Sequence, residues 1–184
     1  MARSKKIRIG IDIGSNSIKL ATFYSKKKNK KQSKLLKYDF LEEDVVKHVR
    51  EINETHIMNG IKSLLADVPY KRADINVGLS SQYQNLFFLQ LPTIAPHELK
   101  QALFWELTPL LPEPVDNYEY DFAMLPQTQK KKINVLLAVI KKNRIEWLQK
   151  VFKSLSCNMS VLETSTLPTI ELFHRANPKL TDPV

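Results

Sequence analysis

The feature that most constrains the fold is a run of alternating isoleucines near the start of the chain. Every second residue from Ile7 to Ile13 is an isoleucine, which is the period of a strand with one buried face. Residues 14–17, Gly-Ser-Asn-Ser, have the composition of a tight turn. Apolar residues then resume at positions 18–23. The pattern predicts a β-hairpin over residues 7–24, around which the rest of the chain is organised.

The tip of this hairpin carries polar groups that suit an anion. Gly14 and Ser15 can present backbone N–H groups, and Lys19 can add a positive charge. Asp12, just before the turn, can orient a metal-bound water if a nucleotide lies there. The alternative is a purely structural turn, because a D-x-G-S pattern of this length also occurs in proteins that bind nothing. At this point both interpretations stay open.

Composition narrows the class of protein. The chain has 184 residues, with 43% hydrophobic and 26% charged residues, which is typical of one ordinary globular domain or two small ones. No apolar run approaches the roughly 20 residues needed to cross a bilayer. A single cysteine, Cys157, and a start without a signal-peptide apolar block favour a reducing, cytoplasmic setting. Cys157 is predicted to lie at the edge of the core, and the four histidines show no metal-ligand spacing.

The formal net charge of +9 is concentrated in clusters. Lysines crowd residues 26–37 and 130–132, and a third basic cluster lies at residues 3–8. Such clusters attract nucleic acid or an anionic membrane surface. No aromatic residue alternates with the lysines, so contact with a membrane surface is favoured over specific nucleic-acid binding. The acidic run at residues 113–121 is interpreted as a solvated rim or a docking surface for a basic partner.

Hydrophobic periodicity predicts the remaining elements. Further strands are expected at residues 35–41, 73–80, 85–91, 118–125, 133–140 and 159–163. Helices are expected at residues 54–66, 97–111, 143–155 and 166–175. Residues 45–52 are ambiguous between an extended segment and a helix. Between residues 84 and 155 the order is strand, helix, strand, strand, helix, which predicts a subdomain inserted into a larger α/β unit.

Three segments together resemble the PilM family. They are IGIDIGSNSIKLA at the hairpin, LQLPTIAPHELKQALFWELTPLLPEPVDNYEYDFAML, and VLLAVIKKNRIEWLQKVFKSLSCNMSVLETSTLPTIELF. The resemblance covers residues 8–173. PilM-like proteins are actin-like members of the type IV pilus inner-membrane assembly platform. They are related to the cell-division protein FtsA and, more distantly, to the cytoplasmic domain of the type II secretion protein GspL.

The resemblance implies a fold and a function. The fold is a partial actin-like (ribonuclease H-like) α/β subdomain 1A, residues 1–80 plus 159–184, with an inserted βαββα subdomain 1C, residues 81–158. The function is a non-catalytic scaffold that binds the N-terminal tail of a PilN-like partner in a groove between the subdomains. The candidate groove residues are Phe87, Leu89, Leu103 and Leu107, and ordinary core packing is the alternative for each of them.

The resemblance also bears on nucleotide binding. Asp12, Gly14, Ser15 and Lys19 match the first phosphate motif of actin-like proteins, whose ATP site needs a second half that this chain does not supply. The expectation is therefore no catalysis and no cofactor for this chain, with ATP–Mg²⁺ only if a C-terminal half exists. The alternative is the nucleotide-binding half of a longer FtsA- or PilM-type ATPase. A short family member, or one that continues into a membrane span, also fits.

The partners and location that the resemblance implies are those of the assembly platform. They are PilN-like and PilO-like membrane proteins and the pilus motor ATPase, at a cytoplasmic location peripheral to or tethered at the inner membrane. Contact with the membrane surface through the lysine clusters is added from the charge pattern. No metal site and no specific nucleic-acid partner are expected.

Overall fold

The computed structural model describes residues 6–15, 17–25, 33–42, 54–71, 73–126 and 131–177. Several predictions lie outside these residues, namely those for Arg3 and Lys5 of the basic cluster, the lysines at 26–31, Lys130 and the ambiguous segment 45–52. The chain divides into two compact units. The first unit is Met1–Gln82 with Leu148–Val184, and the second unit is Tyr83–Trp147. The second boundary falls inside a helix, whereas the sequence placed it near residue 158.

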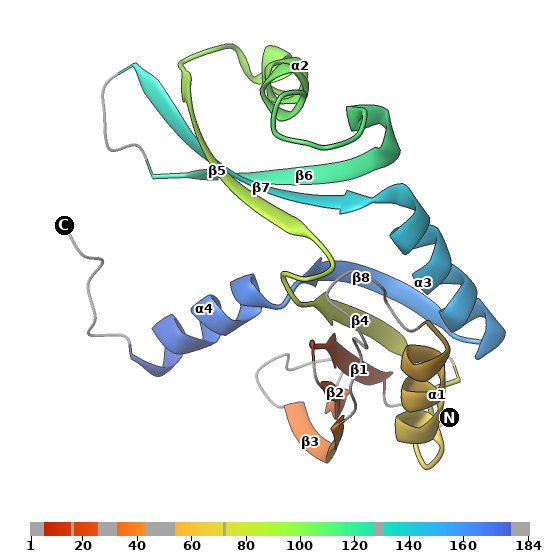
Figure 1. The fold of residues 1–184 in the computed structure, drawn as a ribbon. Coiled ribbons are helices and arrows are strands. Elements are labelled where there is room, and N and C mark those ends of the chain that lie inside the picture. The colour runs from red at the N-terminus through yellow and green to blue at the C-terminus, as the bar shows by residue number, and fades with distance from the viewer. Residues whose placement is uncertain are drawn as a thin grey trace. The chain divides into compact units, whose positions relative to one another are not determined.

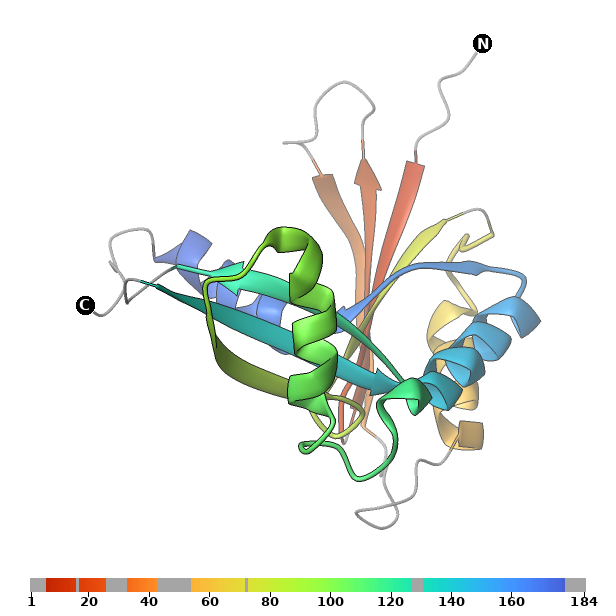
Figure 2. The ribbon, with the colours of Figure 1, turned by 90° about the horizontal axis from the view of Figure 1, so that it is seen from above.

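The first unit is built on a five-stranded sheet (Figure 1). Its strand order is β3 (Ser33–Glu42), β2 (Ser17–Ser25), β1 (Lys6–Ile13), β4 (Asp74–Leu79) and β8 (Asn158–Thr164). The pairs β1–β2 and β2–β3 are antiparallel, and these three strands lie side by side in Figure 2. The pairs β1–β4 and β4–β8 are parallel. The predicted hairpin is therefore confirmed, and β1 lies at the centre of the sheet.

The two faces of β1 differ as the alternation predicts. Ile9, Ile11 and Ile13 are at most 2% exposed. Helix α1 (Glu54–Leu65) turns its own apolar residues inward, among them Ile57 and Ile61, which are fully buried. Gly60 is buried in the same helix. The other face of β1 carries Gly10 and Asp12, and it is described below.

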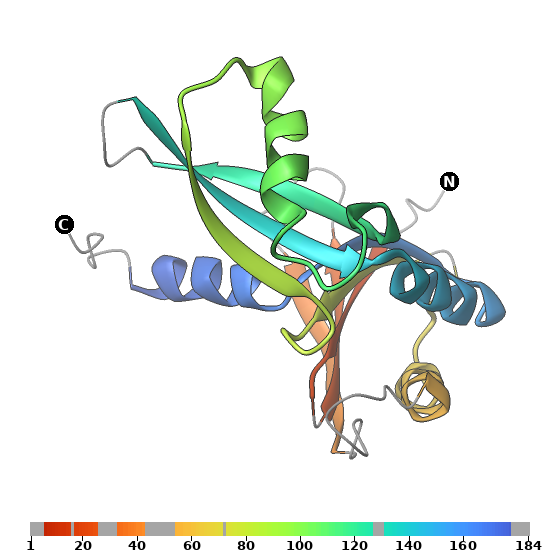
Figure 3. The same cartoon turned by 45° about the horizontal axis from the view of Figure 1, so that its top comes forward.

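The second unit is a three-stranded antiparallel sheet with a helix on one face. The strand order is β5 (Asn85–Pro92), β7 (Lys132–Lys141) and β6 (Tyr118–Leu125). Helix α2 (Pro96–Leu107) follows β5 and lies along the sheet in Figure 3. Its Leu99, Leu103 and Leu107 join a core that includes Val135 and Leu137 of β7. A short 3₁₀ helix, η1 (Val115–Asn117), leads into β6.

Helix α2 is shorter than the predicted span of residues 97–111. It ends at Leu107, and the backbone N–H and the hydroxyl of Thr108 both donate to the Phe104 carbonyl, at 3.2 and 3.0 Å. Pro109 has no N–H to donate and cannot continue the helix. The apolar period of Leu110 and Leu111 belongs instead to the turn that follows.

Two further helices complete the described elements. Helix α3 (Lys142–Ser154) contains the boundary between the units and buries Leu148, Val151 and Phe152. Helix α4 (Thr166–Ala176) follows β8, with Pro168 in its first turn. Among the helices of the described residues, none is long and apolar enough to cross a membrane.

Candidate functional site

The parallel strands of the first unit bring three distant parts of the chain to one sheet edge. Because β1, β4 and β8 run in the same direction, their carboxyl ends meet there. The backbone N–H of Ser80 donates to the Ile13 carbonyl at 3.1 Å, and that of Ser165 donates to the Leu79 carbonyl at 2.9 Å. Ligand sites of α/β sheets commonly lie at this edge. Asp12, Gly78 and Ser165 are thereby brought close together.

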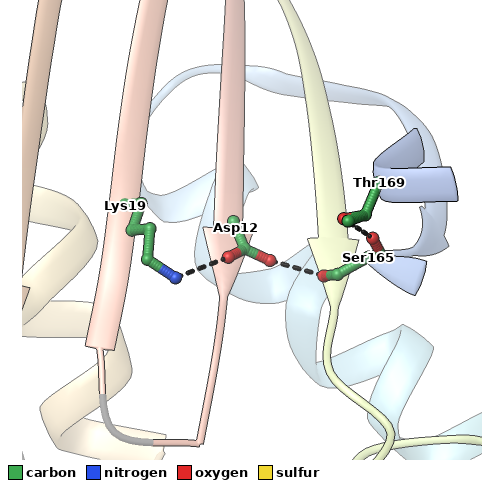
Figure 4. A network of polar contacts seen from close by, with 4 residues as sticks. All are labelled: Asp12, Lys19, Ser165 and Thr169. Atoms are coloured by element: carbon green, nitrogen blue, oxygen red, sulfur yellow. Dashed lines mark hydrogen bonds and ion pairs between the residues drawn. The ribbon is translucent and has the colours of Figure 1, made fainter. Parts of the chain in front are cut away.

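A chain of polar contacts runs across this edge (Figure 4). The ammonium group of Lys19 on β2 donates to Oδ2 of Asp12 at 3.1 Å. The Ser165 hydroxyl, just after β8, donates to Oδ1 of the same carboxylate. The hydroxyl of Thr169 on α4 donates to the backbone carbonyl of Ser165 at 2.8 Å. Both oxygens of the Asp12 carboxylate are thus engaged, one by Lys19 of the adjacent strand β2 and one by Ser165, which follows β8.

The same residues line a hollow of about 500 Å³ on the face of β1 that carries Asp12. Volumes of this order are usual for sites that bind small molecules. Side chains with polar groups contribute part of the lining: Asp12, Lys19, Asn76, Glu163, Ser165 and Thr169. Small or apolar residues contribute the rest: Gly10, Ile11, Leu20, Ala21, Gly78, Pro168 and Leu172. The hollow therefore combines one ammonium group, two carboxylates and two hydroxyls.

Gly78 makes the close approach between Ser165 and Asp12 possible. A Cβ atom at position 78 would lie 3.0 Å from the Ser165 hydroxyl oxygen and 3.5 Å from Oδ1 of Asp12. Such a separation is tighter than ordinary van der Waals contact, so the serine would have to move. Gly10, which also lines the hollow, is different, because the nearest atom to its added Cβ is the Ala21 carbonyl oxygen at 4.0 Å.

Of the four predicted phosphate-binding residues, the structure brings two together. Asp12 and Lys19 form an ion pair in the hollow, whereas Gly14 and Ser15 lie in the hairpin turn and do not line it. The N–H of Gly14 donates to the Ser17 carbonyl at 2.9 Å, which closes the turn. A Cβ on Gly14 would lie 2.9 Å from that same oxygen, so the turn requires glycine. A phosphate contact for Gly14 and Ser15 stays a prediction.

The sequence by itself does not mark Gly78, Ser165 or Thr169 as site residues. The sequence does contain a pattern that points to them, because small and hydroxyl residues follow the ends of two apolar strands. This pattern predicts a site only when the strand order is known, since only strands that run parallel place these ends at one edge of the sheet. The hydroxyl of Ser80 at this edge is buried without a hydrogen-bond partner among the described residues. A buried hydroxyl of this kind is usually satisfied by a water or a ligand atom.

The candidate partner residues of the second unit lie on one face of its sheet. Leu103 and Leu107 are fully buried and pack in the core, so they have no exposed surface for a partner to contact. Phe87 and Leu89 are half-buried and pack against the same core. The opposite face was missed, although the polar Gln90 in the same strand marks it as the outer face. There Phe88 is 62% exposed.

Apolar residues lie beside Phe88 on the same face of the sheet and form an apolar stripe with it. Phe88 pairs with Leu136 of β7, and Leu86 pairs with Ala138. These three neighbours are half-buried. In the described part of the second unit, α2 packs on the other side of the sheet, against Val135 and Leu137.

The remaining titratable candidates have structural partners. Lys141 donates to the Glu113 carboxylate, and this hydrogen bond holds the pKa of Glu113 below its usual value. Cys157 is half-buried, as predicted for the core edge, and burial raises the pKa of its thiol. Among the described residues, no group of histidine, cysteine and acidic side chains could hold a metal ion.

Comparison with known proteins identifies a family. The model of the family described as type IV pilus assembly protein PilM matches residues 10–181. No curated protein matches the chain. A solved PilM–PilN type IV pilus biogenesis complex contains a chain with a TM-score of 0.74 and 18% identity, covering 92% of this chain and 50% of that one.

A second solved structure belongs to a secretion system. It is the cytoplasmic domain of EpsL, an inner-membrane component of the type II secretion system of Vibrio cholerae. Its TM-score is 0.57 at 11% identity, over 86% of this chain and 57% of that one. The chain thus spans about half the length of these solved structures. The two likenesses confirm the predicted α/β class and the partial actin-like fold.

Proposed function

Because the chain belongs to the family of the type IV pilus assembly protein PilM, we propose that it is a non-catalytic scaffold that binds the N-terminal tail of a PilN-like protein. The solved relative in complex with PilN supports the choice of partner. We place this scaffold on the cytoplasmic side of the inner membrane, peripheral to or tethered at it. PilO-like proteins and the pilus motor ATPase are further proposed partners, and the lysine clusters are proposed to contact the membrane surface.

The observation that carries this proposal is the apolar stripe around Phe88. A phenyl ring that is 62% exposed, with Leu86, Leu136 and Ala138 beside it on the same face, is a surface that gains from being covered. An extended apolar tail suits it, because successive side chains of such a tail can pack along the strand direction. Phe88 therefore replaces the buried Leu103 and Leu107 as the leading contact candidate.

The experiment is a calorimetric titration of the protein with a synthetic peptide of a PilN-like N-terminal tail, in the absence of nucleotide. Binding is expected, and Phe88→Asp is expected to weaken it at least about tenfold, as for truncation of an interface hot spot. The matched control is Met124→Asp, because Met124 is also 62% exposed but lies on the opposite face of the sheet. Absence of binding, or equal effects of the two variants, would refute the proposal.

A second candidate function is favoured by the Asp12 hollow. It is the phosphate-binding half of an actin-like ATP site. The residues fit such a group, because Lys19 offers a cation to a phosphate and Asp12 offers a carboxylate to a metal-bound water. If ATP–Mg²⁺ bound here, Lys19 would hold its phosphate groups and Asp12 would hold a metal-bound water. Ser165 would then remain as the group that orients the carboxylate.

This candidate has its own test. The melting temperature of the protein is measured with and without ATP–Mg²⁺, and a rise is expected that Lys19→Met abolishes. Lys62→Met is the matched control, because Lys62 is an exposed lysine on α1, away from the hollow. If ATP–Mg²⁺ leaves the melting temperature of the parent protein unchanged, this function is excluded without affecting the scaffold proposal.

A further inference from the structure

The outer face of α2 carries a large exposed aromatic side chain. Trp105 is 64% exposed, and Leu110 in the turn after the helix is 45% exposed. Trp105 is two residues after Leu103 and two residues before Leu107, and a two-residue step turns about 200° around the helix axis. Trp105 therefore lies opposite the buried stripe of Leu99, Leu103 and Leu107. The indole therefore plays no part in the core.

The indole is nevertheless held in a defined position. Its ring lies 5.4 Å from that of Phe104, measured between centroids, at an interplanar angle of 89°. Phe104 in turn packs against the core of the second unit. An exposed aromatic side chain that is supported by a partly buried one loses little conformational freedom on binding, and tryptophan is enriched among residues that dominate interface energies.

The charge around Trp105 is opposite to that of the whole protein. Glu98 lies seven residues before Trp105, on the same stripe of the helix, and Glu106 follows directly. The Glu98 carboxylate accepts from the Ala95 N–H at 3.3 Å, which holds it at the start of α2. From Pro96 to Asn117 the chain has four carboxylates and one lysine, in a protein of net charge +9. Glu113 already pairs with Lys141, whereas Glu98 and Glu106 flank the indole.

From these observations we infer that the outer face of α2, formed by Glu98, Gln101, Trp105, Glu106 and Leu110, docks an arginine- or lysine-bearing segment of another protein. The cation of that segment lies over the indole, where the ring quadrupole attracts it. The flanking carboxylates pair with its N–H donors, and Leu110 takes an apolar neighbour. This surface is separate from Phe88, so the inference does not depend on the tail-binding proposal.

The experiment uses the emission of Trp105 as its signal. Trp147→Phe removes the other tryptophan of the chain and leaves Trp105 as the reporter. The probes are two synthetic amphipathic peptides of equal length with the same leucines, one bearing arginine and the other glutamate at the polar positions. The arginine peptide is expected to shift the emission until the shift saturates, and a higher salt concentration should weaken this binding. The glutamate peptide is expected to leave the emission unchanged.

Charge reversals then decide whether α2 is the surface involved. Glu98→Lys and Glu106→Lys are each expected to lower the affinity for the arginine peptide at least about threefold, which is the scale of an exposed ion pair. The matched control is Glu146→Lys, because Glu146 is an exposed glutamate on α3. Equal weakening by the control, or no saturable shift in the parent, overturns the inference. An emission change with protein concentration alone would assign the surface to a second copy of the chain and overturn it as well.

Discussion

The hydroxyl of Ser165 donates a hydrogen bond to the carboxylate of Asp12, across 153 residues of sequence. The bond joins the start of α4 to the central strand of the first unit. Lys19 holds the other oxygen of the same carboxylate at 3.1 Å. Asp12 is thus the residue through which the hairpin and the last described helix are linked.

Ser165→Ala removes this link and is expected to lower the free energy of unfolding by about 1 kcal/mol, the usual net worth of a partly buried hydrogen bond. The backbone amides in the first turn of α4 should exchange faster with solvent, because the turn loses its attachment to β1. Urea unfolding and hydrogen exchange measure the two effects. Ser160→Ala, at an exposed serine of β8, is the control and should change stability by less than about 0.5 kcal/mol.

Gly78→Ala is expected to be destabilising by about 1 kcal/mol, whereas Gly10→Ala should be nearly neutral. The reason is the difference in space, since the added Cβ meets the Ser165 hydroxyl at 3.0 Å in the first case and no atom closer than 4.0 Å in the second. In the double variant Gly78→Ala/Ser165→Ala the crowding is relieved, so the two costs should not add. Additive costs in urea unfolding would contradict this account.

Leu103→Ala and Trp105→Ala compare the contributions of the buried and the exposed face of α2 to stability. Leu103 is fully buried, so its truncation should cost about 3 kcal/mol of unfolding free energy through lost transfer energy and the cavity left behind. Trp105 is 64% exposed, and its truncation should cost far less, about 0.5 kcal/mol. Chemical denaturation of the two variants tests the contrast. A large loss in Trp105→Ala would mean that the indole belongs to the core.

Lys141→Met should raise the pKa of Glu113 toward its ordinary value. The hydrogen bond from Lys141 lowers this pKa in the folded protein, so the bond favours the ionised carboxylate. Its contribution to stability is present above the pKa of the unfolded chain and is lost as the pH falls through the lower folded pKa. An NMR titration of the Glu113 carboxyl carbon gives the pKa of Glu113 in the parent protein and in the variant. An unchanged midpoint in the variant would show that Lys141 is not the cause.

Several elements of the fold could be predicted because their signals are local. The alternation from Ile7 to Ile13 and the glycine of the following turn define the hairpin, and α1 shows the apolar face expected of it. The end of α2 could not be placed from periodicity, because Leu110 and Leu111 continue the apolar pattern past Pro109. Periodicity also could not show which side of β5 faces the core, because apolar residues occupy both faces of that strand.

What the sequence determined by itself was the identity of the local elements and, through Asp12 and Lys19, half of the candidate site. Periodicity and turn chemistry are properties of neighbouring residues, so no distant contact is needed to establish them. What only the tertiary structure decided was the strand order β3-β2-β1-β4-β8, which brings Ser165 and Gly78 to Asp12. The physical reason is that a site at the carboxyl ends of parallel strands depends on which strands are neighbours. That choice is made by packing across the whole unit.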